Sequence, residues 1–144
     1  MMKKIYLVGF MLVLAGCQMK PVDDPARKNL DPFDPSAERL HELEGQLLRY
    51  KLDNRRLPTR LDELKAYPIE SGGNPEPICP VSGKAYVYVP DGIRVPGFSG
   101  KLIVYAPQPT QNGLRPCLLI LSDQGPTTVT DVIMLSQDKF DPAN

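Results

Sequence analysis

The chain has 144 residues, with 17 basic and 17 acidic side chains, a single histidine and 42% hydrophobic residues. This even charge balance argues against a nucleic-acid-binding surface and against a polybasic patch for membranes. The length predicts one folded domain with a core of modest size.

The first residues have the layout of a secretion signal. Lys3-Lys4 precede an apolar run over 5–14, and Leu14-Ala15-Gly16-Cys17 follows at its end. A transmembrane helix needs about 20 apolar residues, so this run is too short to span a bilayer and has the length of a signal core. The segment ending in Cys17 resembles the lipobox of bacterial lipoproteins. That resemblance implies cleavage after residue 16 and fatty acylation of Cys17; an ordinary secretory signal with a chance cysteine is the alternative.

Gln18 follows the acylated residue. In Gram-negative lipoproteins an aspartate at this position marks retention in the inner membrane, so Gln18 implies an anchor on the periplasmic side of the outer membrane. Cleavage would leave 128 residues, with 15 basic and 17 acidic side chains. Residues 17–35 are rich in proline and aspartate and cannot bury enough apolar surface to fold alone. They predict an extended tether between the lipid and the domain.

Two helices are predicted after the tether. Asp34-Pro35 offers an N-cap followed by proline at the first helical position. Leucines at helical spacing then predict an amphipathic helix over about 35–53, with Gly45 as a weak point: Leu40, Leu43, Leu47, Leu48 and Leu52. A second short helix is predicted from Thr59, where Thr59-Arg60-Leu61-Asp62 resembles a capping box. Leu61 and Leu64 would form its inner face.

Four short β-rich runs follow a loop over 69–83. They cover 85–89, 102–106, 118–122 and 128–135, and each is bounded by Gly, Pro, Asn or Asp. Their spacing predicts an antiparallel meander. A helix followed by such a sheet predicts an α+β domain over 36–138, with a small sheet of three or four strands and a loose tail over 139–144.

Two segments resemble type II secretion major pseudopilins. Residues 50–64 (YKLDNRRLPTRLDEL) resemble the run that follows the long helix in that family, and residues 83–88 (GKAYVY) resemble the start of its sheet. The resemblance covers about 37–135 and implies a pilin-like head that associates with a secretion or pilus-like apparatus.

The chain departs from that family at two places. Leu14 stands where the glutamate of the pseudopilin N-terminus is expected, and the apolar run ends too early for the membrane-spanning helix. Asp123 and Asp131 lie in the region of the calcium loop, but the carboxylate cluster is not recognisable. The resemblance therefore implies a pilin-like head on a lipid anchor and not a filament subunit.

Two cysteines remain once Cys17 is acylated. Cys79 and Cys117 form an even pair in an oxidising compartment, which is typical of a disulfide. Two separate buried thiols are the alternative, because the sequence does not indicate how far apart they lie. A four-ligand zinc site at Cys79 is excluded by the lack of a CxxC motif and by a single histidine, so no metal or cofactor is expected.

The sequence contains no recognisable catalytic set. His41 lies beside the leucine stripe and is expected to be a half-exposed helix histidine. Without another histidine, no Ser-His-Asp or Cys-His arrangement can be assembled, and no phosphate loop is present. We therefore expect a protein that is not an enzyme.

Basic side chains gather near the junction of the two predicted helices. They are candidates for contact with an acidic envelope partner, and the alternative is an ordinary solvated face of mixed charge: Arg49, Arg55, Arg56 and Arg60. The first functional hypothesis is a membrane-anchored interaction module outside the cytoplasm. The second is a lipoprotein that binds an envelope ligand or polymer through its sheet face or through this basic corner.

Overall fold

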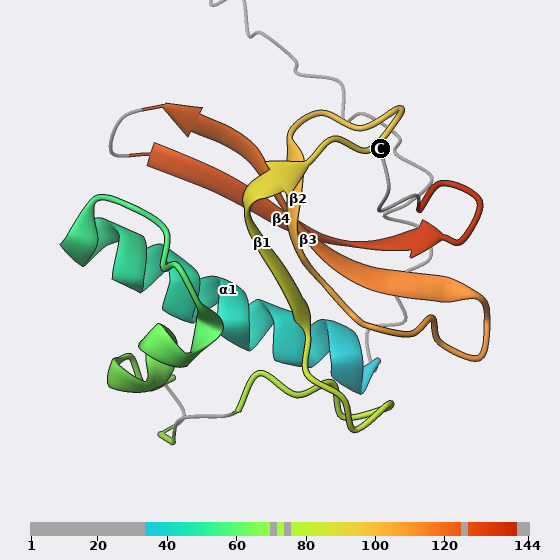
Figure 1. Cartoon of the computed structure of the whole chain (residues 1–144), viewed down its shortest axis with the longest axis horizontal. Coiled ribbons are helices and arrows are strands. Elements are labelled where there is room, and N and C mark those ends of the chain that lie inside the picture. Colours follow the sequence, from blue (N-terminus) through green and yellow to red (C-terminus); the bar gives the residue numbers. More distant parts are fainter. Residues whose placement is uncertain (1–33, 70–71, 74–75, 125–126, 141–144) are drawn as a thin grey trace, which may run out of the picture.

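The computed structural model describes residues 34–69, 72–73, 76–124 and 127–140 (Figure 1). The predicted signal, the predicted lipidation site Cys17 and the predicted tether up to residue 33 lie outside these residues. The elements are α1 (Pro35–Asn54), the 3₁₀ helix η2 (Leu61–Ala66) and the strands β1 (Val87–Ile93), β2 (Lys101–Tyr105), β3 (Leu114–Gln124) and β4 (Thr127–Ser136).

The four strands form one antiparallel sheet in the order β1-β2-β3-β4. This arrangement confirms the predicted α+β class and the meander, with four strands. Within the described ranges, neither helix combines the length and apolar character that crossing a membrane would require.

Local signals set the ends of α1. The Asp34 carboxylate accepts hydrogen bonds from the backbone N–H groups of Ser36 (2.8 Å) and Ala37 (3.1 Å), as the predicted N-cap requires. At the other end Arg55 adopts a left-handed conformation with φ of 60°, and its N–H donates to the carbonyl of Lys51 at 2.8 Å. The helix therefore ends at Asn54, one residue beyond the prediction.

The helix α1 lies across one face of the sheet (Figure 1). Its leucines Leu40, Leu43 and Leu47 are almost fully buried in a cluster with the inward side chains of the sheet, Ile103, Val104, Leu118 and Val132. This confirms that these leucines pack on the sheet. The predicted stripe was too wide, because Leu52 is 59% exposed and points away from the core.

The opposite face of the sheet carries a second cluster. It contains Leu102, Cys117, Leu119, Ile133 and Leu135, with Val95 from the β1–β2 loop and Phe140. Alternate side chains of β3 thus pack into clusters on opposite faces of the sheet. Because both faces of this strand are buried, its apolar residues form a continuous run.

Phe140 belongs to this second cluster and corrects the predicted domain boundary. Its ring lies 4.8 Å from the ring of Tyr105 and 4.2 Å from the guanidinium carbon of the buried Arg115. The folded part therefore extends to residue 140 and does not stop at 138. Residues 141–144 of the predicted tail lie outside the described part of the chain.

Candidate interaction site

The corner where η2 folds back beside α1 is organised around Glu63. One carboxylate oxygen of Glu63 accepts a hydrogen bond from the Tyr50 hydroxyl at 2.5 Å. Its other oxygen accepts from the backbone N–H groups of Thr59 (2.6 Å) and Arg60 (3.0 Å). Glu63 therefore caps η2 and ties it to α1 at the same time.

This arrangement corrects the predicted cap of the second helix. The sequence placed Thr59 at the cap and Asp62 at its third position, but η2 begins one residue later, with Arg60 as the N-cap and Glu63 at the third position. Glutamate is the usual acidic residue at this position because its longer side chain reaches back to the cap.

Aromatic and amide side chains complete the corner. The rings of Tyr50 and Tyr67 lie 5.3 Å apart, and the Asn54 amide donates to the Tyr67 hydroxyl (2.8 Å) and to the Tyr50 carbonyl (2.9 Å). The Tyr88 hydroxyl of β1 donates to the carbonyl of Pro58 at 2.7 Å. These contacts hold the two helices and the edge strand β1 together. Many of them come from residues 50–64, the segment that resembles pseudopilins.

The electrostatics of the corner follow from the same contacts. The hydrogen bond from Tyr50, followed by the backbone bond from Arg60, holds the pKa of the Glu63 carboxyl below its ordinary value. The same hydrogen bond to Glu63 raises the pKa of the Tyr50 hydroxyl. Both shifts favour the protonated Tyr50 hydroxyl and the ionised Glu63 carboxylate that the hydrogen bond between them requires.

The structure divides the four predicted contact arginines into two pairs. Arg56 lies 3.5 Å from the Glu63 carboxylate and 5.5 Å from the centre of the Tyr50 ring, while Arg60 pairs with Asp62 at 2.9 Å. Arg49 and Arg55 are exposed and form no ion pair with any residue in the described ranges. Of the four predicted contact arginines, Arg49 and Arg55 are thus the two without an ion pair in the described part of the chain.

Both of these arginines lie beside exposed, uncharged positions of α1. On α1, Leu52 follows Arg49 by three residues and Gly45 precedes Arg49 by one helical turn, so the three share one side of the helix. Arg55 is the C-cap residue directly after the helix. A Cβ atom added to Gly45 would have nothing within 4 Å, so no contact inside the domain requires glycine there. We call this surface the outer ridge of α1 and define it as Gly45, Arg49, Leu52 and Arg55.

No catalytic constellation is assembled around the histidine. His41 is exposed and its Nδ1 lies 3.1 Å from a carboxylate oxygen of Glu44 on the same helix. In the described ranges, no three His, Cys, Asp or Glu side chains are placed to hold a metal ion. Asp123, from the predicted calcium region, instead pairs with Lys51 and accepts a hydrogen bond from Thr128.

The two cysteines are free thiols in separate places. Cys79 is buried in the cluster under α1, and Cys117 is buried in the cluster on the other face of the sheet. The structure therefore shows two separate buried thiols, which was the predicted alternative to a disulfide. The sheet lies between the two side chains.

Their surroundings affect the two thiols in opposite ways. Burial raises the pKa of Cys117. Burial also acts to raise the pKa of Cys79, but hydrogen bonds to its sulfur outweigh this effect and lower the pKa; they come from Ser36, Ser82 and the backbone of Val81.

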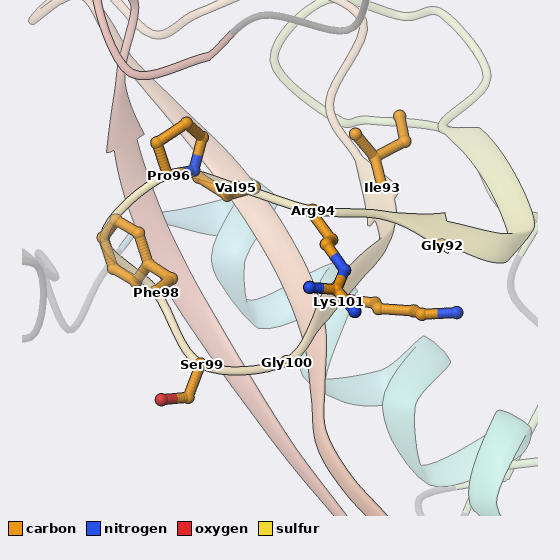
Figure 2. A pocket seen from close by; sticks show the side chains of 9 residues that line it. All are labelled: Gly92, Ile93, Arg94, Val95, Pro96, Phe98, Ser99, Gly100 and Lys101. Atoms are coloured by element: carbon orange, nitrogen blue, oxygen red, sulfur yellow. The ribbon is translucent and has the colours of Figure 1, made fainter. Parts of the chain in front are cut away.

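A hollow in the β1–β2 connection was not predicted from the sequence. It has a volume of about 1020 Å³ and is lined by nine residues between Gly92 and Lys101 (Figure 2). Figure 2 shows the Arg94 side chain pointing toward the start of the Lys101 side chain, which itself runs alongside Gly92. The sequence signal was two glycines and a proline between Arg94 and Lys101, a pattern that by itself indicates only a turn-rich connection.

Comparisons of the chain with protein-family models, with curated proteins and with solved structures find no match. The resemblance to pseudopilins thus rests on the two sequence motifs and on the order of the elements.

Proposed function

We propose that this protein is a lipid-anchored lipoprotein of the cell envelope that acts as a non-enzymatic interaction module. The membrane holds it through acylated Cys17, and the α+β domain contacts an envelope protein through the outer ridge of α1. The pilin-like head further suggests association with a secretion or pilus-like apparatus.

The observation that carries this proposal is the order of the first 17 residues. A positive start, an apolar run of ten residues and a small-small-cysteine sequence occur together at the spacing that a lipoprotein signal needs. Several acyl chains on one cysteine anchor a protein firmly, whereas a single chain binds membranes only marginally.

The outer ridge supports the interaction part of the proposal. Leu52 is a large apolar side chain left 59% exposed, and the unpaired charges of Arg49 and Arg55 flank it. Gly45 weakens the middle of α1 by about 0.5–1 kcal/mol relative to alanine, without any internal contact that needs it. A glycine at this position would allow the backbone of a partner to approach closely.

The anchor is tested by replacing Cys17 with serine in intact cells. We expect the wild-type protein to partition into the detergent phase with a mass increased by acyl chains, and Cys17→Ser to lose both properties. Identical mass and partition for the two proteins would overturn the anchored assignment.

The ridge is tested by crosslinking from a photoreactive residue at position 52 in intact cells. We expect a protein adduct that Gly45→Leu and the double change Arg49→Glu with Arg55→Glu each reduce at least several-fold. Arg60→Glu is the matched control, because Arg60 is exposed but paired with Asp62. Adducts to secretion or pilus components would support the association with that apparatus, whereas equal adducts in all variants would remove the ridge from the interface.

A second function, the binding of envelope polymer through the basic corner, predicts a different result. In that case isolated envelope polymer would be retained by the protein, and retention would fall in all arginine variants, including Arg60→Glu.

A further inference from the structure

We propose that the hollow of the β1–β2 loop binds an organic anion with an apolar body. Its carboxylate or phosphate group would lie between Arg94 and Lys101, and its apolar part would lie against Phe98 and Pro96. This site is separate from the outer ridge of α1 and does not depend on the proposed function.

The loop is held in shape before any ligand binds. Val95 is buried in the second cluster, and the backbone N–H of Phe98 donates to its carbonyl at 3.2 Å. Gly100 has a φ of 94°, and a Cβ atom there would lie 2.7 Å from the Cα of Leu121 in β3. The last residue of the loop therefore rests directly on the neighbouring strand, and little ordering is needed on binding.

The two cations in the hollow lack acidic partners. Arg94 is exposed and forms no ion pair with the described residues. The Lys101 ammonium donates to the backbone carbonyl of Asp91 at 3.1 Å, and a carbonyl leaves its charge uncompensated. An anionic group would form charge-assisted hydrogen bonds with both side chains.

The rest of the lining indicates what the anion must carry. Ile93, Val95, Pro96 and Phe98 make most of the surface of the hollow apolar. A small inorganic anion would leave this surface exposed to water, whereas an attached hydrocarbon would cover it. Lys139 lies 5.9 Å from the centre of the Phe98 ring and adds a third positive charge near the same wall.

The test uses the full chain with Cys17→Ser, labelled with ¹⁵N, in low-salt buffer. Hexyl phosphate and hexanoate are titrated separately while amide shifts are recorded, and inorganic phosphate and hexyltrimethylammonium serve as the two comparison probes. We expect both hexyl anions to shift the amides of residues 92–101, and the tighter of the two identifies the anionic group.

Two charge removals locate the site. Arg94→Gln and Lys101→Gln should each weaken binding of the hexyl anions roughly tenfold, since each removes a charge-assisted contact. Lys84→Gln is the matched control, because Lys84 is exposed, forms no ion pair with the described residues and lies outside the β1–β2 loop; it should leave the affinity unchanged.

Four results would overturn the proposal. Equal binding of hexyltrimethylammonium would show that charge is not recognised, and equal binding of inorganic phosphate would show that the apolar walls do not contribute. Shifts outside residues 92–101, or no shifts at millimolar probe, would show that the hollow is not the site.

Discussion

The helix corner and the β1–β2 loop each bring basic side chains together, but the surroundings of these side chains differ. At the corner, Glu63 and Asp62 neutralise Arg56 and Arg60, and hydrogen bonds connect both helices. In the loop, Arg94 and Lys101 have no carboxylate partner among the described residues. The charges of Arg56 and Arg60 are thus paired within the corner. Arg94 and Lys101 form no such ion pair with the described residues.

This difference explains why the sequence pointed to the corner as the functional site. Four arginines within twelve residues attract attention, but acidic residues are interspersed among them, and two of the arginines are paired. The two cations of the loop are seven residues apart in the sequence and come together only because the loop folds back on itself (Figure 2).

The helix corner and the sheet that carries the loop share one core under α1, and Leu43 tests how α1 packs into it. Replacing the buried Leu43 by alanine should reduce the free energy of unfolding by about 2–5 kcal/mol, because it removes apolar contacts and leaves a cavity. Leu52→Ala, on the exposed side of the same helix, should change it by no more than about 0.5 kcal/mol. Equal effects in urea denaturation would contradict the orientation of α1.

The rigid shape of the loop is tested at its glycines. Gly97 and Gly100 both have positive φ, so alanine at either position should cost about 1–2 kcal/mol of backbone strain. Gly100→Ala should cost about 1–3 kcal/mol more, since its methyl group would meet the backbone of β3 whereas that of Gly97 would meet open space. Equal stabilities of the two variants would show that the loop is not held against the sheet.

Neutralising one cation of the corner and one of the loop tests whether they contribute differently to stability. Arg56→Gln should destabilise the domain by about 0.5–1 kcal/mol, because it removes an exposed ion pair and a contact with the Tyr50 ring. Arg94→Gln should leave the stability unchanged within about 0.5 kcal/mol. A larger loss for Arg94→Gln in chemical denaturation would place this residue in the fold and weaken its assignment to a ligand.

The smallest effect concerns the pH dependence of the corner. Glu63 has a lowered pKa in the folded chain, so the unfolded chain binds the proton more readily. Its contribution to stability is present above the ordinary carboxyl pKa and is lost as the pH falls through the folded value. The melting temperature of Glu63→Gln should therefore fall less steeply than that of wild type below about pH 5. Parallel curves would show that Glu63 does not contribute.

The sequence by itself determined the elements and their order. The cap at Asp34, the leucine spacing of α1 and the turn residues between β-rich runs act over a few residues, so they can be recognised without the fold. The class of the domain followed from these local signals, and so did the burial of Leu40, Leu43 and Leu47.

Only the tertiary structure decided which side chains from distant parts of the sequence contact one another. It placed Cys79 and Cys117 on opposite faces of the sheet, paired Tyr50 with Glu63, and brought Phe140 onto Arg115. It also brought Arg94 and Lys101 to the lining of one hollow, where neither forms an ion pair with a described carboxylate. Such contacts depend on strand register and on the packing of loops against the sheet, which local spacing does not specify.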